Sequence, residues 1–267
     1  MKNHIKKLFS LLISISFLNA STLDLGFGTG GMLYPDYLGS KHENILFVPY
    51  PYISYTSKNL TIDRDGLNGK LFTKKNISLE LSASGSLPVK SRGARESMND
   101  IDSALEIGPA LVYTLYNSKG LNLKLDLPLR MVLSSDFKKI DYHGYVYEIR
   151  AELKYNFDDY LFQLHTGGIW ANSKYNNYLY GVGIEDSTDK RPVYHGKAGY
   201  NGYKTSIGIS KKFKHVWTGA FARHYILTHN VFSNSPLKEK NSAIYGGLFI
   251  AYIFNNNSNR SIIQWLK

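Results

Sequence analysis

Three segments of the chain alternate between apolar and polar residues. From Leu121 to Leu133 every odd position is Leu or Met, whereas the even positions include Lys124, Asp126 and Arg130. A helix would bring these charges into the stripe of leucines, but a strand sends the two sets to opposite faces. The same period of two runs through residues 145–157 and 77–87. We therefore predict β-strands in all three segments.

The predicted strands are long enough to cross a membrane. The alternation continues for about 12 or 13 residues, whereas strands of soluble proteins usually have about 5 or 6. A tilted strand in a transmembrane barrel needs roughly 9 to 11 residues, apolar outward and polar inward. A soluble sandwich or a lipocalin-like barrel would show the same alternation. The strand length and the 21 tyrosines, which suit a lipid–water boundary, favour an all-β, antiparallel transmembrane β-barrel.

The pattern along the whole chain predicts about twelve strands. They lie near residues 22–33, 45–56, 59–65, 67–73, 76–88, 104–116, 121–134, 144–157, 160–173, 198–213, 215–228 and 242–254. Ten strands are the alternative, because the pair 59–65 and 67–73 requires a tight hairpin around Asp65-Gly66. Short turns alternate with long polar loops at 34–44, 89–103, 135–143, 174–197 and 229–241, as a barrel with both ends in the periplasm requires. A short strand at Tyr178 to Val182, above the membrane, is a further possibility.

The two ends of the chain differ from the predicted barrel. Residues 1–20 begin with three lysines and continue through an apolar run from Leu8 to Leu18 to Ala20, the layout of a cleaved secretory signal peptide. The run is too short for a spanning helix, which needs roughly 20 residues. We expect residues 21–254 to form the barrel and residues 255–267 to form a polar C-terminal extension.

Composition excludes several kinds of chemistry. The chain has no Cys, which removes disulfides, thiolate metal sites and cysteine nucleophiles. Its net charge of +11 becomes +8 when the three lysines of the leader are lost (11 − 3), and no basic cluster appears, so nucleic-acid binding is disfavoured.

No motif points to catalysis. Gly26, Gly28, Gly30 and Gly31 do not match a phosphate-binding loop, and glycine here is better explained by close packing or curvature. The stretch Asp63 to Gly66 resembles a calcium loop but lacks the closing glutamate, so we expect a turn. We predict no enzyme activity, no cofactor and no metal site.

Charged residues of both signs occupy the face predicted to point into the barrel. The candidate site is this lumen charge ladder: Glu80, Glu106, Lys124, Asp126, Arg130, Glu148, Arg150, Glu152 and Lys154. Strands 121–134 and 144–157 should be neighbours and form cross-strand ion pairs. The ladder is either a neutralised polar interior or the lining of a selective pore.

A series of short motifs resembles the MipA/OmpV family of outer-membrane proteins, named in part for the MltA-interacting protein. The first is the loop motif Tyr34, Pro35, Asp36, Tyr37, Leu38, Gly39 and Ser40. Further landmarks follow in the same order at 49–52, 66–69, 92–109, 180–182, 194–199 and 234–236, with a last strand ending at Phe254.

This resemblance implies an outer-membrane β-barrel without catalytic residues. For some members it implies a scaffold that links a murein lytic transglycosylase to a peptidoglycan synthase, and for others adhesion or osmotic response. The expected partners are outer-membrane lipids, lipopolysaccharide and these murein enzymes. A narrow channel for small solutes is the alternative. Loop cations Lys90, Arg92, Arg95, Lys190 and Arg191 are candidates for binding host surfaces or lipopolysaccharide phosphates.

Overall fold

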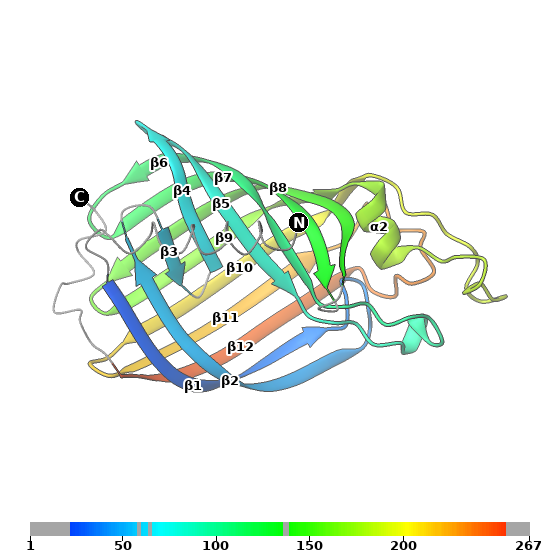
Figure 1. Cartoon of the computed structure of the whole chain (residues 1–267), viewed down its shortest axis with the longest axis horizontal. Coiled ribbons are helices and arrows are strands. Elements are labelled where there is room, and N and C mark those ends of the chain that lie inside the picture. The colour runs from blue at the N-terminus through cyan, green and yellow to red at the C-terminus, as the bar shows by residue number, and fades with distance from the viewer. Residues whose placement is uncertain (1–21, 58–59, 64–65, 136–138, 255–267) are drawn as a thin grey trace.

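The strands form one closed antiparallel barrel (Figure 1). The computed structural model describes residues 22–57, 60–63, 66–135 and 139–254, and this part of the chain contains twelve strands. They are β1 (Thr22–Pro35), β2 (Glu43–Thr56), β3 (Leu60–Asp63), β4 (Gly66–Lys74), β5 (Ile77–Ser86), β6 (Ala104–Asn117), β7 (Leu121–Ser135), β8 (Ile140–Phe157), β9 (Tyr160–Ala171), β10 (Gly199–Lys212), β11 (Val216–Ile226) and β12 (Ser242–Ile253). Strand β1 pairs with both β2 and β12, which closes the barrel.

The twelve strands include the hairpin of β3 and β4, on which the choice between ten and twelve strands depended. Strands β3 and β4 pair from Leu60↔Gly69 to Asp63↔Gly66. Residues 64 and 65 of its turn lie outside the described residues, as do the predicted signal peptide 1–20 and the extension 255–267.

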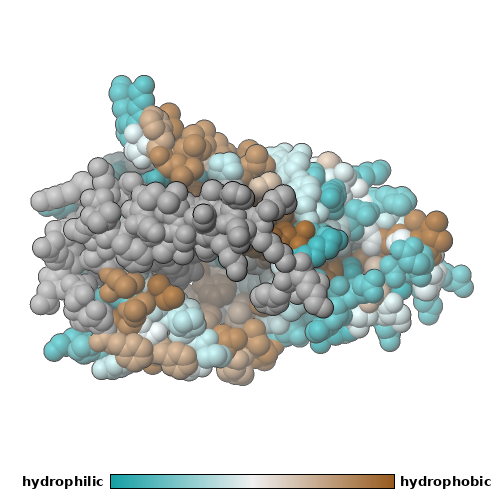
Figure 2. All heavy atoms as spheres, viewed as in Figure 1, coloured by the Kyte–Doolittle hydropathy of each residue, from teal (hydrophilic) through white to brown (hydrophobic). Residues whose placement is uncertain are grey.

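The wall follows the predicted alternation. In β7, Asp126, Arg130 and Val132 are buried, whereas Leu129 and Met131 are 47% and 51% exposed on the outside. Figure 2 shows brown, hydrophobic residues along the strands, whereas the end that carries the long loops is mostly teal. Because the bilayer core offers no partner for polar groups, this apolar band is the surface that lipid covers.

Glycines mark places where neighbouring strands approach closely. A Cβ added to Gly28 would lie 1.9 Å from the carbonyl oxygen of Ile250, and one added to Gly108 would lie 2.0 Å from that of Leu129. No side chain fits at such distances, so the wall can bend tightly there only with glycine. The prediction that glycine in the first strand serves close packing is confirmed.

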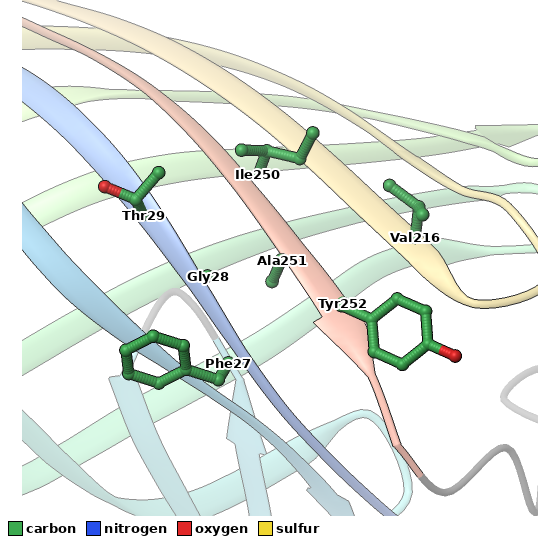
Figure 3. A pocket seen from close by; sticks show the side chains of 7 residues that line it. All are labelled: Phe27, Gly28, Thr29, Val216, Ile250, Ala251 and Tyr252. Atoms are coloured by element: carbon green, nitrogen blue, oxygen red, sulfur yellow. The ribbon is translucent and has the colours of Figure 1, made fainter.

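The closest approach of β1 and β12 leaves a shallow apolar groove on the outer wall (Figure 3). Its floor is Gly28 and Ala251, and Phe27, Ile250 and Tyr252 rise beside it. The groove has a volume of about 310 Å³ and lies within the lipid-facing band.

The connections separate into two ends. The short turns after β4, β6, β8 and β10 and both described chain ends lie at one end, and the long loops, with helix α2 (Ser173–Tyr180) and the short 3-10 turn η1 (Gly93–Arg95), lie at the other (Figure 1). In transmembrane barrels the short turns are periplasmic, so the loop end faces outward. In the described part of the chain, no helix has the length and apolar character needed to cross a bilayer.

The possible strand at Tyr178 to Val182 was wrong. Tyr178 to Tyr180 belong to α2, whose first turn is capped by the side chain of Asn172, which accepts a 3.1 Å hydrogen bond from the Tyr175 amide. Asn176 and Tyr180, at helical spacing, are both buried: Asn176 hydrogen-bonds Asn201, and Tyr180 belongs to the apolar cluster of the loops. The helix also contacts β8. Only Val182 makes a β-bridge, with Tyr194.

Candidate functional site

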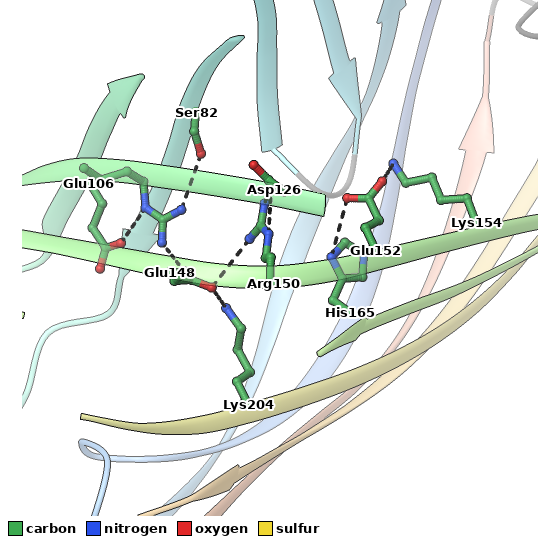
Figure 4. Close-up of polar contacts among 10 residues, drawn as sticks. Ser82, Glu106, Asp126, Glu148, Arg150, Glu152, Lys154, His165 and Lys204 are labelled. Carbon is green, nitrogen blue, oxygen red and sulfur yellow. Dashed lines mark hydrogen bonds and ion pairs between the residues drawn. The ribbon is translucent and has the colours of Figure 1, made fainter. Parts of the chain in front are cut away.

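Glu148 is the centre of the lumen charge ladder (Figure 4). It is 3% exposed and pairs with Arg130 and with Lys204, whose Nζ lies 2.5 Å from its Oε2. Arg150 lies 3.7 Å away on the same carboxylate. A buried charge without a partner of opposite sign costs much free energy. The three cations around Glu148 offset this cost for its carboxylate, and the carboxylate does the same for them.

Two further groups extend this network along the barrel. Arg130 also donates to Glu106 at 3.0 Å and to Ser82 at 3.4 Å. Arg150 binds Asp126, its cross-strand partner, with a 2.7 Å hydrogen bond from Nε. The ion pairing expected between strands 121–134 and 144–157 is thus found at Asp126 and Arg150, which face each other in the register of β7 and β8.

The remaining ladder residues are less tightly connected. Glu152 contacts Lys154 at 3.3 Å and His165 at 3.7 Å, and it stands opposite Lys124 in the register of β7 and β8. Glu80 accepts a 2.7 Å hydrogen bond from Ser78 on its own strand. All nine predicted side chains lie on the inward face, but Glu80 and Lys124 make none of the ion pairs found between the described residues.

Sequence reasoning missed Lys204, Lys212 and Asp24. Lys212 of β10 reaches Asp24 of β1 at 2.6 Å, although two strands lie between them in the barrel. Lys204 of β10 similarly passes β9 to reach Glu148 of β8. The inward position of Lys204 and Lys212 was readable from the alternation with the outward Ile207 and Ile209, but the residues that they pair with were not.

Aromatic rings occupy part of the interior on the side of β2, β11 and β12, which differs from the expected polar lumen. Tyr50 and Tyr52 of β2 meet Trp217 of β11 with ring centroids 5.9 Å and 5.4 Å apart. Phe249 of β12 lies 5.1 Å from Tyr50, over Gly30, where a Cβ would lie 2.0 Å from its ring. Aromatic rings thus bridge the interior between strands that are not neighbours.

The outer loops pack into a folded cap with its own apolar core. The buried residues of this cap are Tyr37, Val89, Met98, Ile101, Tyr180, Val182, Tyr225, Leu227, Phe232, Leu237 and Ala243. Tyr180 stacks on Phe232 at 3.7 Å and donates to the carbonyl of Leu38 at 3.0 Å. Burial raises the pKa of the Tyr180 hydroxyl far above its usual value, so it remains a neutral donor.

The family-like loop motif lies at the base of this cap. Tyr34 and Pro35 end β1. The hydroxyl of Tyr37 donates to the Leu237 carbonyl at 2.6 Å, and the Gly39 carbonyl accepts 2.8 Å hydrogen bonds from the amides of residues 239 and 240. Gly39 has a φ of +96°, which favours glycine. Ser40 Oγ accepts from the His42 amide at 3.0 Å.

Asp36 joins this motif to the β5–β6 loop. Arg92 binds its carboxylate through two nitrogens, at 2.8 Å and 2.6 Å, and Asn44 donates to it at 2.8 Å. Partial burial alone would raise the pKa of Asp36, but the hydrogen bonds from Arg92 and Asn44 outweigh it and lower the pKa.

Most of the loop cations predicted to bind external phosphates are engaged within the cap. Lys90 pairs with Asp100 at 2.8 Å, and Arg92 pairs with Asp36. Arg95 donates to the Leu179 and Asn99 carbonyls, and Arg191 donates to those of residues 94, 96 and 186. These side chains therefore hold the loops together.

No metal-binding cluster accompanies these features in the described part of the chain. Over the described ranges, no group of three or more His, Asp or Glu side chains is arranged to hold a metal ion. The polar clusters are ion pairs and loop contacts, in which single atoms such as Arg95 Nε have no hydrogen-bond partner among the described residues.

A closed barrel with an apolar outer band and a partly polar, ion-paired interior defines an integral protein of the bacterial outer membrane. The family model of the MltA-interacting protein MipA matches residues 27–254, and the chain belongs to this family.

Two kinds of known protein are similar to the chain. It is 34% identical over 92 residues to the outer membrane protein Omp26La of Vibrio anguillarum, a match that covers 33% of this chain and spans about a third, 34%, of that relative. Outer membrane phospholipase A from Escherichia coli is 14% identical with a TM-score of 0.31, covering 90% of this chain and 96% of the phospholipase. The outer membrane protease OmpT from Escherichia coli is 10% identical with a TM-score of 0.31, covering 87% and 94%.

Proposed function

We propose that this protein is a non-enzymatic interaction barrel, whose periplasmic turns hold enzymes of murein metabolism. The family name supports a partner of the lytic transglycosylase class, since it describes an MltA-interacting protein. A peptidoglycan synthase bound at the same rim would complete the scaffold. Outer-membrane lipid and lipopolysaccharide surround the apolar band of the wall.

The single observation that carries this proposal is the bridged interior. Ion pairs and aromatic contacts join strands that are not neighbours: Glu148 with Lys204, Asp24 with Lys212, and Tyr50 with Trp217. Such contacts cross the interior, whereas a channel needs a continuous aqueous path. The loops at the outward end pack on one another around an apolar core. These features favour binding at the surface over transport through the barrel.

The periplasmic rim offers a surface of suitable chemistry. Its short turns carry exposed Lys74, Lys75 and Lys119, against Asp158 and Asp159. This excess of positive charge favours an acidic face on the partner and speeds association.

The test is a pull-down of a purified murein lytic transglycosylase by the detergent-solubilised chain. Replacing Lys74, Lys75 and Lys119 together with Glu should abolish capture, whereas Lys190→Glu in the outer cap is the matched control and should not. The proposal is contradicted if the triple variant and the Lys190→Glu control both capture the transglycosylase. It is also contradicted if neither variant captures it.

The alternative function, a narrow solute channel, is favoured by the charges of the lumen. It predicts a stable open conductance in a planar bilayer that changes when Lys124 or Arg130 is replaced. We expect no such conductance, because Arg130 is held by Glu106 and Glu148.

A further inference from the structure

The cap contains a pocket that the scaffold function does not use. It has a volume of about 280 Å³ and lies between the β5–β6 loop and the loop that follows α2. Its polar lining includes Arg95, Asn99, Asn177, Glu185 and Asp186, together with Asp100, whose charge is paired with Lys90 at 2.8 Å. Tyr178 supplies a ring.

Two closed loops make the walls of this pocket. Backbone hydrogen bonds of 2.8 Å and 2.9 Å between Val89 and Ile101 close the first loop, and bonds of 2.9 Å and 3.1 Å between Val182 and Tyr194 close the second. Arg191 then ties the second loop to the first through two carbonyls, at 3.1 Å and 2.8 Å. The pocket is therefore formed before any ligand binds, which lowers the entropic cost of binding.

The pocket offers hydrogen-bond groups without protein partners. Arg95 is 4% exposed, and its Nε has no acceptor among the described residues. No hydrogen bond within the described ranges reaches the carboxylates of Glu185 and Asp186. Arg95 Nε is a buried polar group without a partner among the residues that the structure describes, which costs free energy that a ligand with a suitable acceptor recovers. Glu185 is exposed and Asp186 is half-buried, so their carboxylates are accessible to the donors of a ligand.

The charges of the pocket limit the class of ligand. Glu185 and Asp186 repel a phosphate, and the buried guanidinium of Arg95 repels an ammonium group. A metal ion would need a cluster of acidic ligands, and none is found in the ranges that the structure covers.

We propose that this pocket binds the sugar ring of a neutral saccharide. Each sugar hydroxyl both donates and accepts, so neighbouring hydroxyls suit the carboxylates of Glu185 and Asp186 together with the donors of Arg95, Asn99 and Asn177. Tyr178 offers an apolar surface to the C–H face of the ring. The volume is near the lower end of ligand pockets, about 300 Å³, which fits one or two rings. Because the cap faces outward, the sugar is either free in the medium or part of a surface oligosaccharide.

The experiment is isothermal titration of the full chain in detergent with four probes. Glucose and N-acetylglucosamine represent free sugars, and lipopolysaccharide core oligosaccharide freed of lipid A represents a surface glycan. Spermidine is the charged control. Glu185→Gln and Asp186→Asn should each weaken saccharide binding at least tenfold. The matched control is Asp189→Asn, which alters a carboxylate of the same loop outside the pocket and should bind as the parent does. Heat-modifiable migration in gels verifies that each variant is folded.

Each outcome decides the proposal. Binding of the free sugars with loss in the two pocket variants supports it and shows that one ring is enough. Binding of the core oligosaccharide alone, with the same loss, supports it and identifies a surface glycan as the source. The proposal fails if none of the three saccharides binds, if saccharide binding is unchanged in both pocket variants, or if spermidine binds instead and loses affinity in those variants.

Discussion

Replacing Glu148 with Gln tests whether the lumen network is held by one buried anion. The substitution keeps the size of the side chain but removes the charge that Arg130, Arg150 and Lys204 share. Arg130 and Arg150 keep their other carboxylates, Glu106 and Asp126, whereas Lys204 loses the only ion-pair partner that it has within the described residues.

The expected loss follows from the burial of this group. Glu148 is 3% exposed, so solvent cannot replace the missing charge. Removing one partner of a buried ion pair costs about 3 to 5 kcal/mol. With a urea dependence of about 3 kcal/mol per molar, the unfolding midpoint should fall by about 1 to 1.7 M.

The assay is urea unfolding in detergent micelles, followed by tryptophan fluorescence. The double variant Glu148→Gln with Lys204→Met should recover about 1 to 2 kcal/mol, since it removes the cation left without a partner. The control is Asp159→Asn in an exposed periplasmic turn, which should change stability by less than about 0.5 kcal/mol.

Two results would refute this reasoning. An unchanged midpoint in Glu148→Gln would mean that water reaches the network and screens it. A double variant that is less stable than the single variant would mean that Lys204 acts through packing and not through its charge.

Three further predictions concern other parts of the molecule. Because the folded-state pKa of Asp36 is lowered, its pairing with Arg92 contributes stability above the unfolded pKa of about 3.9 and loses it as pH falls through the folded value. The rate of proteolysis in loop 87–103 should therefore stay constant from about pH 7 to 4 and rise at lower pH. The variant Asp36→Asn should be cleaved faster at every pH. A rate for the parent chain that stays constant down to about pH 2 contradicts this prediction. Leu129→Arg places a charge on the lipid face and should cost about 2 to 4 kcal/mol in urea unfolding, whereas an equal effect of Leu129→Ala would argue against lipid contact. Gly28→Ala should reduce the heat-resistant folded band in gels, because its Cβ would meet the Ile250 carbonyl at 1.9 Å, and an unchanged band would show that the strands can separate there.

The wall was predictable wherever one face is apolar and the other polar. The predicted strand 121–134 matches the observed Leu121–Ser135, because its leucines and charges leave only one assignment of faces. Strand β2 gave no such signal: Phe47 and Tyr50 are both apolar, but Phe47 is 78% exposed outside, whereas Tyr50 packs inside on Trp217. The aromatic part of the interior was missed for that reason.

The cap was predictable only as a set of long loops. Its motif residues were noticed through a family resemblance, but nothing in the local pattern indicated that Tyr37 would reach Leu237, 200 residues away. The helix at Ser173–Tyr180 was missed because aromatic residues at 178 and 180 alternate as a strand would. Its capping residue, Asn172, was the available signal.

The sequence by itself determined the strands, the two faces of the wall and the family. Side-chain alternation is a local property of the extended backbone, so it can be read residue by residue. Only the tertiary structure decided which side chains meet across the interior and how the loops enclose a pocket. Glu148 and Lys204 are 56 residues apart on strands that do not touch, and they meet because closure and strand tilt bring their inward faces together.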